Sequence, residues 1–117
     1  MSRVDADVIK EDKLNTTMNA MELIKEVTTY IQNNGGVYFE WYVGIASDPR
    51  QRLFVEHGVK EIGDVWIFST ADNASMARAA EKHLLDVLRA DGGPGGGDNT
   101  TTVVYAYKKA WHTKERN

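Results

Sequence analysis

Hydrophobic residues recur along residues 20–33 at helical spacing, and the polar residues between them fall on the opposite side. Asn19 and Glu22, at the start of this pattern, have the spacing of a capping box. Gly35 and Gly36 follow directly after it, and glycine commonly ends a helix. The pattern therefore predicts an amphipathic helix over residues 20–33 that packs one face on the core.

The hydrophobic period changes to two over residues 37–46, where aromatic and β-branched residues are frequent. Successive side chains of a strand point to opposite faces, so odd and even positions separate. The odd positions are apolar, whereas the even ones include Tyr38, Glu40 and Tyr42. We predict a strand whose apolar face packs on the core and whose other face is the place for chemistry.

Capping residues predict two further helices. Asp48 as N-cap and Pro49 at the first helical position predict a short helix that runs to about residue 57 and ends at Gly58. Asp72 or Asn73 caps a long helix that extends to about residue 90. Strand-forming residues precede this second helix at 64–70 and return at 101–109.

The elements alternate between helix and strand, an order that also suits parallel βαβ units. The same order also suits an antiparallel sheet flanked by helices, so the element order leaves both arrangements open. The glycine-rich residues 91–98 match neither the P-loop nor the dinucleotide-binding spacing, so we interpret them as a flexible connector. We expect a flexible arm at 1–14, one domain at 15–110, and a polar tail at 111–117 anchored by Trp111.

Composition narrows the function classes. The chain of 117 residues contains no cysteine, which excludes disulfides and thiolate zinc sites. No signal segment or membrane-length apolar run is present, so we expect a cytoplasmic protein without membrane contact. The net charge of −3 predicts that any binding to DNA is weak and salt-dependent. The sequence still allows a local basic patch from five residues: Arg50, Arg52, Arg78, Lys82 and Lys108.

Three features of the chain fall at informative spacings. Tyr42-Val43-Gly44 ends a strand, Arg52 follows Tyr42 by ten residues, and Glu81 lies on the next long helix. In these features the segment from Tyr42 to Leu88 resembles the GIY-YIG nuclease family. The resemblance implies an α/β (α+β), GIY-YIG-like fold, with a small, three-stranded, mainly antiparallel sheet flanked by helices. It also implies roles for three residues: Tyr42 helps activate water, Arg52 engages the scissile phosphate, and Glu81 holds one Mg²⁺ or Mn²⁺ ion.

Each of these residues also has a plain structural interpretation. Tyr42 would pave the sheet, and Arg52 would be a solvated helix residue. Glu81 has apolar neighbours three and four positions away, so its carboxylate lies at the core face and needs a partner. That partner is a metal ion, an arginine such as Arg52 or Arg78, or a hydroxyl group. His57 is a further candidate base, although it follows Arg52 by five residues where related nucleases commonly have four.

The first half of the family signature is incomplete in this chain. Gly36-Val37-Tyr38 resembles the GIY element, but only three residues separate it from Tyr42, which is too few for a hairpin. The first strand is therefore missing or replaced. We predict that the C-terminal strand pairs in the vacant position and returns a tyrosine, Tyr105, to the site.

We therefore expect a metal-dependent nuclease that hydrolyses DNA phosphodiester bonds, with a protein partner or a homodimer supplying substrate recognition. The main alternative is a non-catalytic GIY-YIG-like domain that binds protein or nucleic acid. A third is a small α/β interaction domain whose motif match is accidental. Convergence of Tyr42, Arg52 and Glu81 on one site would favour the nuclease.

Overall fold

A computed structural model describes residues 17–93 and 98–116. The predicted arm at 1–14 and the middle of the glycine-rich connector lie outside the described residues. The elements follow one another as α2 (Ala20–Asn33), η1 (Tyr38–Glu40), β1 (Trp41–Ala46), η2 (Gln51–Glu56), β2 (Trp66–Thr70), α3 (Ala74–Asp86) and β3 (Val103–Lys108). They build an α+β fold, as the sequence predicts.

The last strand in the sequence lies in the middle of the sheet. The strand order is β1-β3-β2, and β3 pairs antiparallel with both neighbours. Gly44 and Phe68 lie opposite Tyr105 from the two sides, and Tyr42 lies opposite Tyr107. The prediction that the C-terminal strand pairs beside the strand carrying Tyr42 is confirmed, and the parallel alternative is wrong.

The helix α2 has its predicted bounds. The Asn19 side chain accepts a hydrogen bond from the Glu22 amide, and the Glu22 carboxylate accepts one from the Asn19 amide, both at 2.9 Å. These two bonds form the predicted capping box, which satisfies amides that the first turn leaves unpaired. After the helix, Gly35 and Gly36 have φ values of 118° and 79°, a region that other residues rarely occupy.

Several predicted boundaries are wrong. Residues 38–40 form a 3₁₀ turn and not the first half of a strand, so β1 begins at Trp41. Residues 51–56 form a π-helix within the expected helical segment. Asn73, one of the two proposed caps, accepts from the Met76 amide at 2.9 Å, but α3 ends at Asp86, four residues early.

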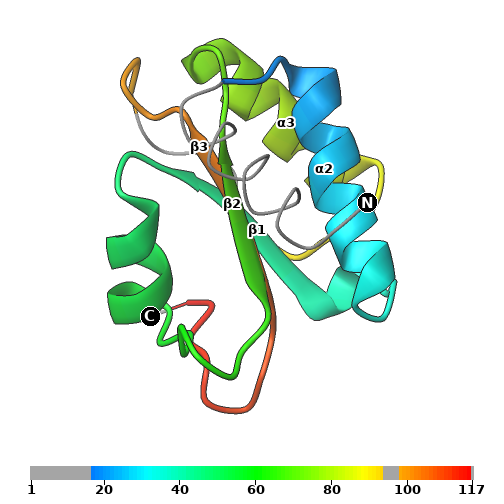
Figure 1. Ribbon diagram of the computed structural model, residues 1–117, viewed down its shortest axis with the longest axis vertical. Coiled ribbons are helices and arrows are strands. Elements are labelled where there is room, and N and C mark those ends of the chain that lie inside the picture. The colour runs from blue at the N-terminus through cyan, green and yellow to red at the C-terminus, as the bar shows by residue number, and fades with distance from the viewer. Residues whose placement is uncertain (1–16, 94–97, 117) are drawn as a thin grey trace, which may run out of the picture.

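The two faces of the sheet pack against different partners (Figure 1). On one face, α2 and α3 lie side by side and bury the apolar side of β1, including Trp41, Val43 and Ile45. On the opposite face, Tyr42, Tyr105 and Tyr107 pack against Leu53 of η2. The polar face predicted for the first strand is thus a second, tyrosine-rich core, and η2 covers it.

The C-terminal segment runs beside η2 (Figure 1). Trp111 does not anchor it, because 93% of this residue is exposed. Polar contacts hold the segment instead: the Lys114 amide donates to the His57 carbonyl at 2.7 Å, and Thr113 is buried. Specific hydrogen bonds therefore fix the position of this segment, although its composition predicts only a polar tail.

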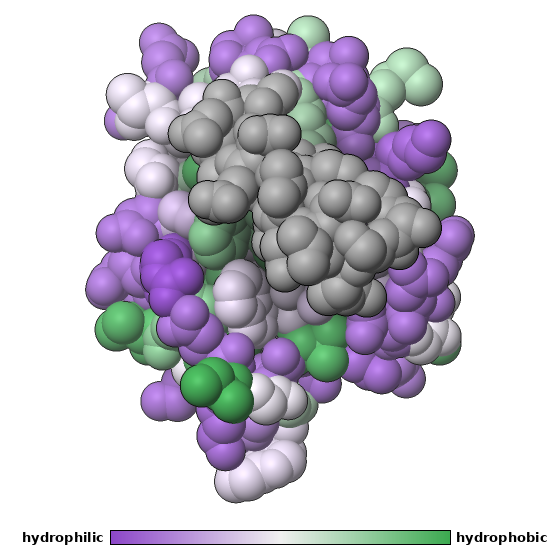
Figure 2. Space-filling view, in the orientation of Figure 1, coloured by the Kyte–Doolittle hydropathy of each residue, from purple (hydrophilic) through white to green (hydrophobic). Residues whose placement is uncertain are grey.

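The outer surface is mixed in character. Figure 2 shows a face on which hydrophilic residues predominate and hydrophobic residues are scattered among them. None of the described helices is both long enough and apolar enough to cross a bilayer.

Candidate active site

The π-helix places Arg52 and His57 on the same side of η2. The segment starts with the Asp48 carboxylate accepting from the Gln51 amide at 3.1 Å, as an N-cap does. The His57 amide then donates to the Arg52 carbonyl, five residues earlier, at 2.9 Å. A π-turn contains one residue more than an α-turn, so residue i+5 stacks over residue i where i+4 otherwise would. The π-turn therefore places His57 beside Arg52 on one side of η2, although five residues and not four separate them in the sequence.

His57 joins the two tyrosines of β3. Its Nε2 lies 2.8 Å from Tyr105 Oη, and its Nδ1 lies 2.6 Å from the Lys114 carbonyl oxygen. A carbonyl oxygen only accepts, so Nδ1 carries the proton of the neutral imidazole. Nε2 is then the acceptor, and Tyr105 donates its hydroxyl proton to it. His57 is thus oriented as a base toward the Tyr105 phenol.

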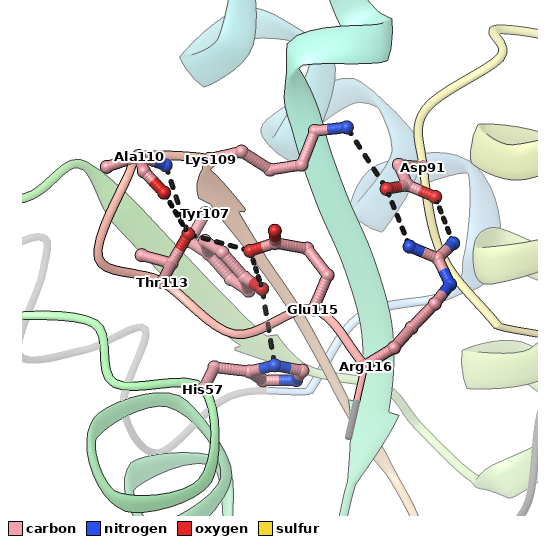
Figure 3. Close-up of polar contacts among 8 residues, drawn as sticks. All are labelled: His57, Asp91, Tyr107, Lys109, Ala110, Thr113, Glu115 and Arg116. Carbon is pink, nitrogen blue, oxygen red and sulfur yellow. Dashed lines mark hydrogen bonds and ion pairs between the residues drawn. The ribbon is translucent and has the colours of Figure 1, made fainter.

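A second hydroxyl orients the imidazole from the other side (Figure 3). Tyr107 Oη lies 3.2 Å from His57 Nδ1 and donates to Glu115 Oε2 at 2.9 Å. Glu115 also accepts from the Thr113 hydroxyl at 2.7 Å. A chain of hydrogen bonds therefore runs from the Tyr105 hydroxyl to His57, from His57 to Tyr107, and from Tyr107 to the side-chain carboxylate of Glu115.

Gly44 permits the close approach of Tyr105 to β1. A Cβ atom on Gly44 would lie 2.5 Å from Tyr105 Oη and 2.6 Å from Cζ. The phenol therefore crosses the edge strand at the only kind of residue that leaves room for it. The glycine of the Tyr42-Val43-Gly44 motif has a structural function here, which is to seat the ring of Tyr105.

Tyr42 stacks on the same group of rings. Its ring centroid lies 4.8 Å from that of His57, 5.5 Å from Tyr107 and 6.4 Å from Tyr105. Tyr42 is 9% exposed, more than Tyr105 at 1% or Tyr107 at 0%. Of the three phenols, Tyr42 is the one nearest to solvent.

Arg52 supplies the positive charge. Its Nε lies 3.0 Å from Glu56 Oε1, and 40% of its side chain is exposed. The contact is an ion pair and not an aligned hydrogen bond, because Nε has no acceptor at hydrogen-bonding geometry. Burial opposes the charge, but contact with the Tyr105 phenol and with Glu56 outweighs it and raises the pKa of Arg52. Arg52 therefore remains a cation beside Tyr105.

Burial sets the protonation states of the cluster. Burial raises the pKa of the Tyr105 phenol to about 12, although Arg52 opposes this, and burial also raises the pKa of Tyr107, with Glu115 adding to the rise. Burial lowers the pKa of His57, and the Arg52 charge adds to this effect. At neutral pH the site therefore contains protonated phenols, a neutral imidazole and a guanidinium cation.

Glu81 lies on α3, which packs on the opposite face of the sheet from the tyrosine cluster. It is 5% exposed, and no described residue donates a hydrogen bond to its carboxylate. Burial raises the pKa of Glu81 to about 7, with the Arg78 charge partly offsetting the rise. Its charge is also the smallest of the causes that act on the raised pKa of Tyr105. Arg52 pairs with Glu56 and not with Glu81, so one of the two proposed arginine partners is wrong.

A divalent cation is compatible with this arrangement. Mg²⁺ keeps several waters and is often bound through one or two carboxylates, and Glu81 is a buried carboxylate that lacks a hydrogen-bond donor within the described residues. Across 17–93 and 98–116, no group of three histidine or acidic residues could hold a metal by itself. Glu81 would thus be a single protein ligand.

The predicted basic patch is largely neutralised. Arg50 pairs with Glu61 at 2.5 Å, and Lys82 pairs with Asp86 at 2.6 Å. Arg52 pairs with Glu56, as described above. These pairs reduce the field that the patch presents to a polyanion, in keeping with the weak DNA binding expected from the net charge.

The structure brings together four of the five predicted site residues: Tyr42, Arg52, His57 and Tyr105. Sequence reasoning missed Tyr107 and Glu115 as parts of the site. Tyr107 shares a strand face with Tyr105, so the period of two was a usable signal. No signal in the sequence pointed to Glu115, because its contact depends on the path of the C-terminal segment.

Comparison of the chain with protein-family models, curated proteins and solved structures found no match.

Proposed function

We propose that this protein is a metal-dependent nuclease that hydrolyses phosphodiester bonds of DNA. The observation that supports the proposal is the convergence of Arg52 and Tyr42 on the hydrogen-bonded pair formed by His57 and Tyr105. These groups come from β1, η2 and β3, which are far apart in the sequence. A cation, a base and phenols on one site are what cleavage of a phosphodiester requires.

Arg52 would bind the scissile phosphate. Negative charge builds on the non-bridging oxygens as the bond is cleaved, and a guanidinium fork stabilises that charge. To do so, Arg52 exchanges its pairing with Glu56 for the phosphate, and its partial exposure makes that exchange feasible. Tyr42, the most exposed phenol of the cluster, would donate to the same phosphate.

Tyr105 and His57 would move the proton of the attacking water. Proton transfer from the Tyr105 phenol, whose pKa burial raises to about 12, to His57, whose pKa burial lowers, is strongly unfavourable in the resting site. The Tyr105 phenol is therefore not ionised in the resting site and does not act there as a base. It would pass its proton to His57 Nε2 only as it accepts one from water, while the Lys114 carbonyl holds the imidazole in the required tautomer.

Glu81 would hold the cation through its carboxylate. A bound Mg²⁺ or Mn²⁺ supplies a water of lowered pKa and neutralises the leaving oxygen. The cost of burying Glu81 as a carboxylate is then offset by the ion. A protein partner or a second copy of the chain would provide further contacts to DNA, since three of the five patch cations pair with carboxylates.

A plasmid-nicking assay with Mg²⁺ or Mn²⁺ tests the proposal. Arg52→Ala should reduce nicking by about 100-fold or more, the usual loss for a donor that stabilises transition-state charge. Glu81→Gln and Tyr105→Phe should also reduce it. Arg50→Ala is the matched control, because it removes one positive charge from the same segment outside the tyrosine cluster. Equal nicking by the parent, Arg52→Ala and Glu81→Gln would refute the proposal.

A non-catalytic binding domain is the second candidate. The observation that favours it is the burial of His57, Tyr105 and Tyr107, whose polar atoms already bond with one another. On this hypothesis the network is structural, and DNA or protein binds at the surface above it. Binding of DNA at equal strength by the parent and Tyr105→Phe, without nicking by either, would favour this candidate.

A further inference from the structure

A depression of about 390 Å³ lies on the far side of β1 from β3 and β2. It is built where the segment after α3 meets the start of β1 and the end of β3. Its lining consists of Phe39, Leu85, Arg89, Ala90, Asp91 and Lys109. A volume of this size is within the range of small-ligand sites and suits one nucleotide.

The depression adjoins the candidate active site through the backbone. The Asp91 amide donates to the Trp41 carbonyl, and the Val43 amide donates to the Asp91 carbonyl, both at 2.8 Å. Asp91 therefore flanks Tyr42 along the edge of the sheet. A strand of nucleic acid whose phosphate lies at Arg52 and Tyr42 would extend along this edge.

Two cations hold Asp91, as Figure 3 shows. Lys109 Nζ lies 3.0 Å from Asp91 Oδ2, and Arg116 Nη2 lies 2.5 Å from Oδ1. Arg89 adds a third cation, and no carboxylate of the described residues pairs with it. Three cations and one carboxylate therefore lie at this edge, whereas Arg50 and Arg52 at η2 each pair with a glutamate.

Arg89 and Phe39 are both exposed and both line the depression. Arg89 has φ 68°, a conformation that favours glycine. Phe39 is 66% exposed, and Lys109 Nζ lies 5.2 Å from its ring centroid. An exposed aromatic ring beside cations is the arrangement that binds single-stranded nucleic acid, through base stacking and phosphate contacts.

We propose that this depression is a subsite for one unpaired nucleotide of the substrate strand, with its base stacked on Phe39 and its phosphate bound by Arg89 and Lys109. The inference rests on the proposed function for its substrate class, DNA. It adds that the strand is unpaired at this subsite, which a duplex substrate would satisfy only at an end, a flap or a locally melted segment.

Binding measured without cleavage tests the inference. Fluorescence anisotropy would follow labelled dT12, a 12-residue abasic phosphate chain and a 12-base-pair duplex, with EDTA and in an Arg52→Ala background. We expect dT12 to bind more tightly than the duplex. Phe39→Ala should weaken dT12 by about 5- to 100-fold and leave the abasic chain unchanged, because only the base stacks.

Arg89→Gly is the second test variant, and it is chosen to preserve folding. Glycine suits φ 68°, so the melting temperature should be equal to or above that of the parent. Binding of dT12 and of the abasic chain should both weaken, and the salt dependence should fall by about one phosphate contact. Lys60→Ala and Ile62→Ala are the controls, since both residues precede β2 at the opposite edge of the sheet.

The outcomes separate this inference from the proposed function. Unchanged dT12 binding by Phe39→Ala and Arg89→Gly would overturn the subsite even if the parent nicks plasmid. Equal affinity for duplex and dT12, insensitive to Phe39→Ala, would also overturn it. Loss of dT12 binding in the two variants would support the subsite even if the parent nicks nothing.

Discussion

Replacement of Gly44 by alanine tests the geometry of the site independently of any activity. The added Cβ would lie 2.5–2.9 Å from three atoms of Tyr105, Oη, Cζ and Cε2. Carbon atoms in contact lie about 3.5–4.0 Å apart, so the ring must shift by roughly 1 Å. Tyr105 is 1% exposed and has no free space to enter.

Two costs follow from that shift. Overpacking of a buried ring costs about 1–3 kcal/mol. A movement of roughly 1 Å also breaks the 2.8 Å bond between Tyr105 Oη and His57 Nε2, and a buried polar group left without its partner costs about 1–3 kcal/mol. Alanine in a strand recovers about 0.5–1 kcal/mol relative to glycine. We therefore expect Gly44→Ala to lower the free energy of unfolding by about 2–4 kcal/mol.

Urea denaturation of a double-mutant cycle measures this effect. In a Tyr105→Leu background the ring is absent, so Gly44→Ala should be neutral or slightly stabilising. The difference between the two backgrounds is then the coupling energy of Gly44 and Tyr105. A loss below about 1 kcal/mol in the parent, or an equal loss in both backgrounds, would contradict the described contact.

Three further predictions concern charged and polar groups. Glu81 has a pKa of about 7 in the folded protein against 4.5 in the unfolded chain, so its contribution to stability falls by about 3 kcal/mol as pH rises from 4.5 through 7. Glu81→Gln should therefore stabilise the protein at pH 8 but not at pH 4.5. A difference in stability that does not depend on pH would contradict this. Tyr107→Phe removes the hydroxyl between His57 and Glu115, and thermal unfolding should reveal a loss of about 1–3 kcal/mol, whereas an unchanged melting temperature would refute the network. Asp91 has its pKa lowered to about 2 from 3.8, so Asp91→Asn should cost about 1–2 kcal/mol at pH 7, and the difference should diminish as pH falls toward 2 in urea titrations.

Local signals in the sequence predicted the elements well where the chain itself determines them. The capping box of Asn19 and the glycines after residue 33 define both ends of α2 without help from tertiary contacts. The strand at 37–46 was overextended because residues 37–40 keep strand-like alternation while forming a 3₁₀ turn. The π-helix had no sequence signal, since its extra residue depends on how Leu53 and His57 pack under β3.

The site was predictable in its parts and not in its connections. The motif spacing located Tyr42 and Arg52, and the strand period placed Tyr105 and Tyr107 on one face. The tautomer of His57 depends on the Lys114 carbonyl, which is contributed by a segment that looked like an unstructured tail. Contacts between segments fifty residues apart follow from chain path and not from local pattern, so a single sequence does not reveal them.

Two features of the fold, unrelated in the sequence, bring side chains to the same site. β3 pairs with β1 and places Tyr105 beside Gly44. The π-turn brings His57, five residues after Arg52, within hydrogen-bonding distance of Tyr105. Catalytic groups are defined by geometry and chemical role, not by their order in the chain. We propose that these two features stand in for the first strand and the four-residue spacing of the GIY-YIG pattern that the sequence resembles. An accidental resemblance would give no reason for both to act at one site, so their convergence favours a site built for chemistry over one built only for packing.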